Sequence, residues 1–149
     1  MFQGREALLE QLLQEKLRRG LRFADIAQMI GKTKEGCAAA FFGDMAFSEE
    51  EARRLAAVFS LPEGAEVLLC LPPERRGLEN DIPRDPILYR LHEMIQVWGR
   101  AIHALIQEEF GDGVMSAVDF TLALEKEENP KGDRVRLTLS GKFLPYPVS

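Results

Sequence analysis

The sequence predicts an α+β protein, in which a set of short helices is followed by one long helix and a two-stranded antiparallel hairpin. Three observations lead to this fold class. In the first half, apolar residues recur at helical spacing between capping residues and glycine stops. A long amphipathic segment follows, from Asp85-Pro86 to Gly111. The remainder contains two segments in which apolar and polar residues alternate, separated by a turn-forming stretch.

Five short helices are expected in residues 1–76. Gly20, Gly31 and Gly43 each follow a helical apolar pattern and are typical helix stops. Ser48 followed by Glu51 is a capping box, in which each side chain accepts a hydrogen bond from the other residue's backbone N–H. The expected helices are Arg5–Arg19, Phe23–Ile30, a third from its cap Thr33 to Phe42, a fourth from its cap Ser48 to Phe59, and Ala65–Leu71.

The second and third helices have the outline of a helix-turn-helix within a five-helix, repressor-like bundle. This bundle either binds DNA as a regulator or serves packing and assembly. The helix that would meet base edges begins Thr33-Lys34-Glu35-Gly36, so it offers one Lys beside a repelling Glu. Both halves are acidic, with 11 basic against 13 acidic residues up to Asn80 and 8 against 11 after it. We therefore expect no binding of nucleic acid and keep a DNA-binding regulator as the alternative function.

The long helix is expected to begin at Pro86, with Asp85 as its N-cap, and to end at Phe110 before Gly111. Its apolar residues recur at helical spacing and form one broad face. They are Ile87, Leu88, Leu91, Met94, Ile95, Trp98, Ile102, Leu105 and Ile106.

A second row of residues shares one side of this helix, at steps of three or four. It consists of Arg90, Glu93, Val97, Ala101 and Ala104. The row is either a second contact surface with an Arg–Glu pair set into it, or an exposed ion pair above small residues. The residues alone favour the exposed pair.

The two alternating segments predict a hairpin. Val114–Leu124 is the first strand, residues 125–133 form the turn, and Val135–Leu139 lies in the second strand. By parity Ser116 falls on the apolar face, where it either meets a ligand or bonds back to the turn before it. Two strands and one helix are marginal alone, so we expect residues 77–149 to associate intimately with a partner subunit.

Three segments in register resemble the cyanase family (cyanate hydratase, also called cyanate lyase). They are DPILYRLHEM, EEFGDGVMSAVDF and LSGKFLPY, and weaker similarity reaches from LRFADIAQMIG to Gly77. Ser140 and Phe143 depart from the pattern, in which an Asp and a Tyr are common. The resemblance implies that Arg90, Glu93 and Ser116 are the catalytic residues.

The resemblance further implies an enzyme, a carbon–oxygen lyase that decomposes cyanate to ammonia and carbon dioxide via carbamate. Bicarbonate would be the co-substrate, and no cofactor or metal would take part. The implied assembly is a homodecamer of five dimers with interlaced C-terminal segments, and its sites are built from adjacent subunits. Residues 1–76 would be the helical bundle and 77–149 the catalytic and dimerisation domain.

Other chemistry finds little support in the sequence. Cys37 and Cys70 lack metal-ligand spacing, and His92 and His103 are not placed as a ligand pair, so we expect reduced thiols and no metal site. A hydrolase using Ser116 as its nucleophile would need a nearby His, while an oligomer that has lost activity would look the same outside the catalytic positions. No signal pattern or membrane-spanning apolar run is found, so a cytoplasmic protein without membrane partners is expected.

Overall fold

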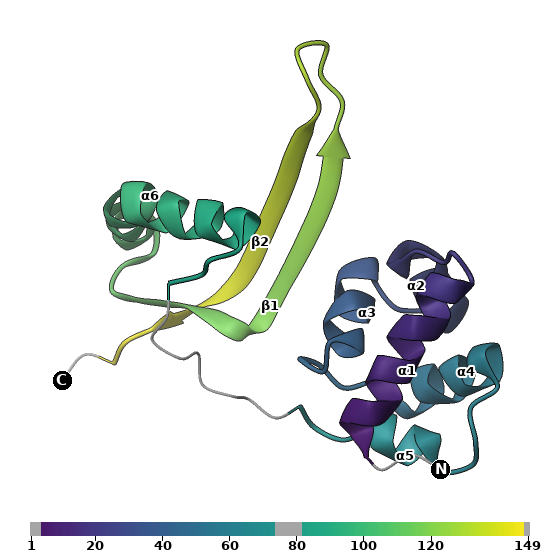
Figure 1. Cartoon of the computed structure of the whole chain (residues 1–149). Coiled ribbons are helices and arrows are strands. Elements are labelled where there is room, and N and C mark those ends of the chain that lie inside the picture. Colours follow the sequence, from purple (N-terminus) through teal and green to yellow (C-terminus); the bar gives the residue numbers. More distant parts are fainter. Residues whose placement is uncertain (1–3, 74–81, 148–149) are drawn as a thin grey trace. The chain divides into compact units, whose positions relative to one another are not determined.

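The computed structural model describes residues 4–73 and 82–147, and the chain divides into two compact units, Met1–Arg76 and Gly77–Ser149. The units are described separately below. The α+β class is confirmed, since several helices precede a long helix and an antiparallel hairpin (Figure 1). The elements are α1 (Arg5–Arg18), α2 (Phe23–Ile30), α3 (Lys34–Phe41), α4 (Glu49–Phe59), α5 (Ala65–Leu69), α6 (Pro86–Phe110), β1 (Gly113–Glu127) and β2 (Arg134–Pro145).

The first unit has a continuous apolar core to which all five of its helices contribute. Phe41 lies within it and is fully buried. Its ring meets those of Phe23 and Phe47 edge-on, with centroids 5.5 and 5.9 Å apart. The largest other fully buried side chains are Leu8, Leu12, Ile26, Ile30, Leu55 and Leu69.

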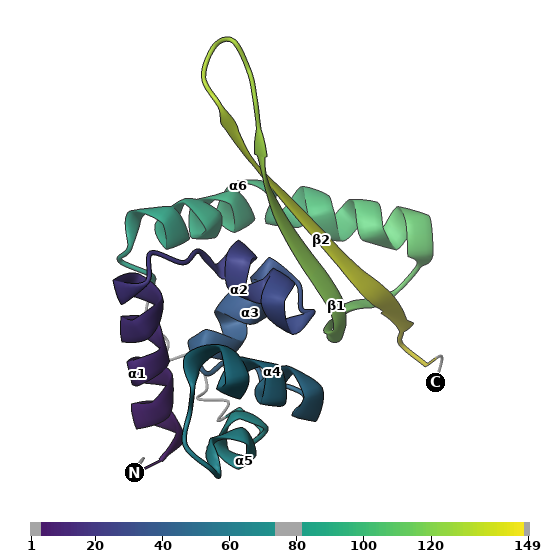
Figure 2. The same ribbon diagram turned by 90° about the vertical axis from the view of Figure 1, so that its right-hand side faces the viewer.

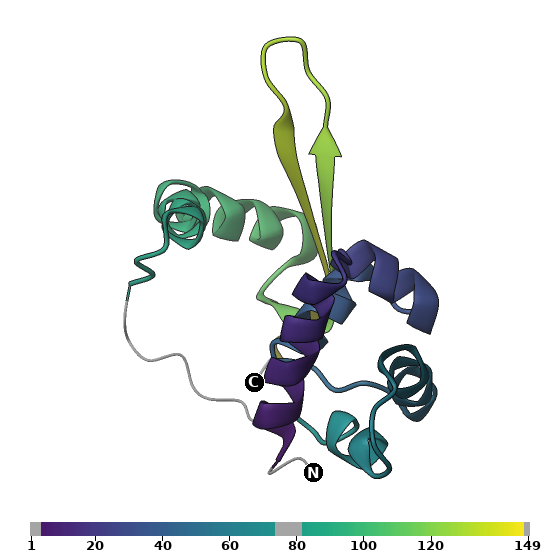
Figure 3. The same cartoon turned by 45° about the vertical axis from the view of Figure 1, so that its right-hand side comes forward.

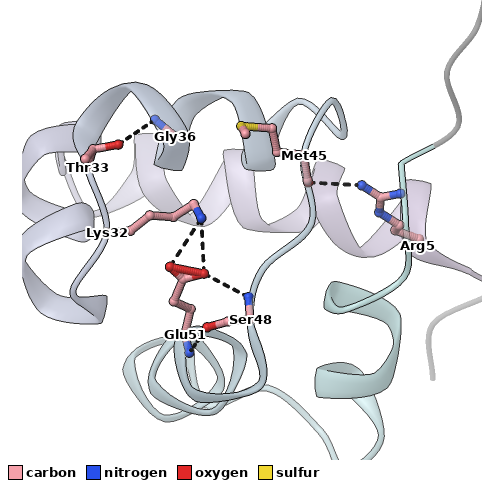
Figure 4. Close-up of polar contacts among 7 residues, drawn as sticks. All are labelled: Arg5, Lys32, Thr33, Gly36, Met45, Ser48 and Glu51. Carbon is pink, nitrogen blue, oxygen red and sulfur yellow. Dashed lines mark hydrogen bonds and ion pairs between the residues drawn. The ribbon is translucent and has the colours of Figure 1, made fainter. Parts of the chain in front are cut away.

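Capping contacts fix where these helices start, as the sequence predicts. The Thr33 hydroxyl accepts from the Gly36 N–H at 3.1 Å. The Ser48 hydroxyl accepts from the Glu51 N–H at 3.1 Å, while the Glu51 carboxylate accepts from the Ser48 N–H at 2.8 Å (Figure 4). That carboxylate also accepts from Lys32 Nζ at 3.1 Å, so one side chain joins the segment between α2 and α3 to the start of α4.

The ends of three helices differ from the expected ones. Helices α1 and α3 each end one residue early, at Arg18 and Phe41, and α5 ends at Leu69 rather than Leu71. The difference at α5 is consistent with Pro72, because the residue before a proline is sterically disfavoured in a helix. By composition the segment ERRGLENDIP (residues 74–83) is predicted to be a polar linker, and residues 74–81 of it lie outside the described residues.

Helix α6 has the predicted bounds, and its N-cap is the predicted one. The Asp85 carboxylate accepts from the backbone N–H groups of Ile87 and Leu88, at 2.9 and 3.1 Å. No residue of α6 is buried within the chain, and even Trp98 is 61% exposed. The apolar face therefore exists as predicted, and the chain itself leaves it uncovered.

The hairpin is longer than predicted. Strands β1 and β2 pair from the base to Glu127 opposite Arg134, so the turn is shorter than residues 125–133. Figure 3 shows the two strands side by side below the hairpin tip. Charged residues continue the ladder because they pair across it: Lys126 Nζ lies 3.3 Å from an Asp133 carboxylate oxygen, and Arg134 Nε lies 3.6 Å from one of Glu127. The hairpin tip extends away from α6 (Figures 1 and 2).

Candidate active site

Arg90 and Glu93 form an ion pair near the start of α6. Arg90 Nη1 donates to Glu93 Oε1 at 3.0 Å, because residues three apart share one side of a helix. Their side chains are 68% and 40% exposed. Within one chain this is the exposed pair that the residues alone favoured, and such pairs stabilise proteins little. The Arg90 guanidinium has further N–H donors, and these can bind an anion.

Ser116 lies in an irregular part of β1, where the predicted alternation is wrong. Met115 is paired with Phe143 and Phe120 with Gly141, so four residues of β1 stand opposite the single residue Lys142. This irregularity, here called the β1 bulge (residues 116–119), bends the strand near its start (Figure 1). Parity arguments fail across it, because extra residues on one strand reset which face each side chain meets.

The hydrogen bonds of Ser116 fall within the β1 bulge. Its side-chain oxygen accepts from the backbone N–H groups of Val118 and Asp119, at 3.1 and 2.9 Å. These are forward contacts, in place of the considered bond back to the turn before the strand. Ser116 is 8% exposed and is the one buried residue in the described part of the second unit. With two acceptor sites occupied, the hydroxyl has its hydrogen left to donate.

The start of β1 is fixed against the end of α6. The rings of Phe110 and Phe143 stack with centroids 5.1 Å apart. The Tyr146 N–H donates to the Asp112 carbonyl at 3.0 Å. Gly113 has room for no side chain, since a Cβ there would lie 2.6 Å from the Phe143 ring. The segment just before Ser116 is therefore held by contacts at the end of α6 and at the end of β2.

The structure brings Arg90 and Glu93 together but not Ser116. No hydrogen bond or ion pair joins Ser116 to either residue in the described part of the chain. Arg90 precedes Phe110 by 20 residues, about 30 Å along a helix, and the six residues from Phe110 to Ser116 span at most about 22 Å when extended. The Cα atoms of Arg90 and Ser116 thus stay at least about 8 Å apart, even if the chain runs straight back along α6.

Sequence reasoning missed Gly141 and Met115, which contact the β1 bulge. A Cβ on Gly141 would lie 2.6 Å from the Ser116 carbonyl oxygen and 3.0 Å from Met115 Sδ. A glycine inside a strand pattern, as in LSGKF, is the signal that could have indicated a bulge or a close backbone approach.

Three further features of the described residues bear on metal binding, thiol chemistry and membrane spans. Within residues 4–73 and 82–147, no group of three or more His, Cys, Asp or Glu side chains is placed to hold a metal ion. Both cysteines are free; burial raises the pKa of Cys37 to about 11 and raises that of the half-buried Cys70 as well. None of the described helices is long and apolar enough to cross a membrane.

Comparison with known proteins gives matches along both units. Residues 5–73 match the family described as cyanate hydratase, N-terminal, and residues 80–148 match the cyanate lyase C-terminal domain. The chain is 44% identical over 142 residues to the cyanate hydratase of Ralstonia pickettii, covering 95% of this chain and 97% of that protein. It is 43% identical over 143 residues to that of Dechloromonas aromatica, covering 96% and 97%.

A solved structure is also similar. The crystal structure of cyanase from T. urticae matches with a TM-score of 0.78 and 34% sequence identity, covering 93% of this chain and 97% of that one. The similarity therefore includes both the helical unit and the unit that carries Arg90, Glu93 and Ser116.

Proposed function

Because this chain belongs to the cyanate hydratase (cyanate lyase) family, and is thus a lyase that degrades cyanate, we propose that it does so with bicarbonate as co-substrate. The observation that carries the proposal is the match to cyanate hydratases over nearly the whole of both chains, together with the Arg90, Glu93 and Ser116 positions.

In the proposed reaction, bicarbonate and cyanate first combine into one adduct, which then breaks at a different bond from the one just formed. A bicarbonate oxygen attacks the cyanate carbon, the nitrogen takes up a proton, and the adduct loses carbon dioxide to leave carbamate. Carbamate takes up a second proton and breaks down to ammonia and carbon dioxide. No group on the protein forms a covalent bond in this scheme. We propose, as the family resemblance implies, that no metal or cofactor is required.

The protein's task is then to hold two anions in contact. At 4 Å two unit charges repel by about 4 kcal/mol at an effective dielectric constant near 20. The forked guanidinium of Arg90 suits this task better than an ammonium group would. One Arg90 cannot balance two anions and the adjacent Glu93, which supports a site that contains Arg90 from two neighbouring subunits. Positioning alone supplies about 7–11 kcal/mol when two reactants are held in attack geometry.

Two features of the second unit support a site shared between chains. The apolar face of α6 is exposed in the single chain, as expected of a surface that another subunit covers. Ser116 reaches Arg90 of its own chain only if the intervening segment is fully extended, whereas Ser116 of another chain is free of this restriction. We infer a homodecamer of five dimers with interlaced second units, as the family resemblance implies.

The contacts suggest a role for each residue. Glu93 holds the Arg90 guanidinium at 3.0 Å and either orients it or carries the proton that nitrogen requires. Ser116 donates its hydroxyl hydrogen to an anion oxygen. Its oxygen already accepts from two N–H groups, which argues against the alternative in which Ser116 is a nucleophile.

The alternative of a DNA-binding regulator is not supported by the helical unit. Lys32, before the would-be recognition helix, is 16% exposed and paired with Glu51. Lys34 at the start of that helix is paired with Glu35 at 3.0 Å. Both lysines are thus paired with carboxylates, which weakens their attraction for phosphates. We propose that the bundle serves assembly rather than nucleic-acid binding.

An ammonia-release assay tests the proposal. Cyanate should yield ammonia when bicarbonate is present, and turnover should nearly vanish in buffer depleted of carbon dioxide. Addition of a metal chelator should leave the rate unchanged. Persistence of the activity without bicarbonate, or its loss with chelator, would refute the mechanism proposed here.

A further inference from the structure

We propose that Gly141 is a positioning residue for Ser116: the absence of a side chain at position 141 lets the β1 bulge seat against β2 and fixes the direction of the Ser116 hydroxyl. The inference rests on the proposed function, because it assigns Gly141 an effect on catalysis through Ser116. Gly141 itself lies on β2 and contacts neither Arg90 nor Glu93 among its nearest neighbours.

Position 141 has no room for a side chain. A Cβ built on Gly141 would meet Met115 Cγ, the Ser116 carbonyl oxygen at 2.6 Å and Met115 Sδ at 3.0 Å. Real Cβ atoms essentially never approach so closely, so something must move. The Gly141 φ angle is not positive, so alanine fits the backbone conformation and only these contacts oppose it.

The group that would have to move is the backbone of Ser116 itself. Its carbonyl oxygen has no rotatable side chain that could relieve the contact, whereas the Met115 side chain can rotate. A shift of the Ser116 peptide group changes the angle at which the Val118 and Asp119 N–H groups reach its hydroxyl oxygen. Those two bonds aim the remaining hydrogen, so a displaced bulge misdirects the proposed donor.

The first experiment compares Gly141→Ala with Ser140→Ala. Ser140 is the exposed neighbour on the same strand, and its substitution adds no atom. Amide hydrogen exchange, measured by mass spectrometry on the intact assembly, should be faster at residues 116–119 in Gly141→Ala and unchanged in Ser140→Ala. The kcat/KM for cyanate should fall at least about tenfold in Gly141→Ala only. Unchanged exchange together with unchanged kcat/KM would overturn the proposal.

A double-mutant cycle separates positioning from a general structural effect. If Gly141 acts through Ser116, adding Gly141→Ala to Ser116→Ala should cause no further fall in kcat/KM. A further tenfold fall in the double variant would show that Gly141 acts by another route. Full activity of Ser116→Ala would instead overturn the proposed site, so the two failures are distinguishable.

A second variant covers the case in which Gly141→Ala does not assemble. Met115→Ala removes the side-chain atoms that pack on Gly141 and adds none, and Met115 is half-exposed, so this variant should still fold and assemble. It should also speed exchange at residues 116–119 and lower kcat/KM, with no additional effect in the Ser116→Ala background. Wild-type exchange in Met115→Ala would count against the proposal.

Discussion

At the scale of single residues, Ser116 and Arg90 differ in what the chain itself supplies. Ser116 is buried and its oxygen is occupied by two backbone N–H groups, so its geometry is set by contacts within its own strand. Arg90 is exposed and held by Glu93 alone, so its final surroundings depend on what covers α6. The candidate site thus combines a hydroxyl donor oriented by its own strand with a guanidinium group whose surroundings depend on what covers α6.

Ser116→Ala should therefore lower both activity and stability. Parity on the sequence suggested a hydroxyl on an apolar face, whose removal would leave the fold intact. The β1 bulge instead loses the acceptor of two N–H groups, a cost of about 0.5–1.5 kcal/mol per hydrogen bond, because Val118 and Asp119 are exposed enough for water to replace part of the lost contacts. Hydrogen exchange across residues 116–119 should speed up while exchange in α1–α5 stays unchanged.

The control for this prediction is Thr121→Ala, which removes an exposed hydroxyl from the regular part of the same strand. It should change neither exchange nor ammonia release. Equal exchange rates for wild type and Ser116→Ala would show that the two bonds to the hydroxyl contribute nothing to the bulge.

At the scale of elements, the helices follow local rules and the hairpin does not. The starts of α3, α4 and α6 could be predicted because the N-cap and the N–H groups it accepts from lie within three residues. The position and size of the β1 bulge could not, because they depend on contacts with the other strand, and Gly141 in the sequence indicates only that a bulge or a close approach is possible. The proximity of Arg90 to Ser116 could not be predicted from the sequence pattern either, because the proposed site takes them from different chains.

The capping box of α4 should also make the first unit sensitive to acid. Burial raises the pKa of Glu51, but hydrogen bonds from Ser48 and Lys32 outweigh it, so its pKa lies below the ordinary 4.5. A carboxyl group with a lowered folded pKa stabilises the fold above its unfolded pKa, and this contribution disappears as pH falls through the folded value. Glu51→Gln should therefore reduce amide protection in α4 at pH 7, by roughly 1 kcal/mol, and this deficit should shrink as the pH falls through the lowered pKa of Glu51.

Glu50→Gln is the matched control, because Glu50 is the preceding residue and pairs with Arg54 at 2.7 Å on the exposed side of α4. Exposed pairs of this kind contribute about 0.3–0.5 kcal/mol. Two results would contradict the argument: equal effects of the two substitutions at pH 7, or a deficit of Glu51→Gln that stays the same down to the pH at which the protein unfolds.

At the scale of the whole molecule, the two units differ in how they are stabilised. The first unit has a core of buried apolar side chains from five helices. In the described part of the second unit, α6 and the hairpin expose their large apolar residues. Association through the second unit would cover these surfaces and complete the candidate site in one step.

Mixing two inactive variants tests this arrangement. Arg90→Lys keeps the charge but loses the forked donors, and Ser116→Ala loses the hydroxyl, so each should fall about a hundred- to a thousandfold in kcat/KM. Oligomers that contain both kinds of subunit should recover part of the activity, because some sites then take Arg90 from one chain and Ser116 from another. Light scattering should show an assembly far larger than the 16.8 kDa chain.

Arg90→Lys mixed with Glu93→Gln is the control for complementation, since these residues pair within one chain and no intact pair is regenerated. Proven mixed oligomers of Arg90→Lys and Ser116→Ala that stay as inactive as their parents would argue against a shared site.

The single buried residue in the described part of the second unit also bears on how the protein comes to be folded. A chain emerging from the ribosome can bury the core of its first unit alone, since that core joins helices close in sequence. The described part of the second unit has almost no core of its own, so in the proposed assembly this unit would fold on encounter with another chain. Its folding would then be bimolecular, and the fraction of ordered second units would depend on protomer concentration. Dilution would thus act on this half of the protein as a denaturant does, while the first half stays folded.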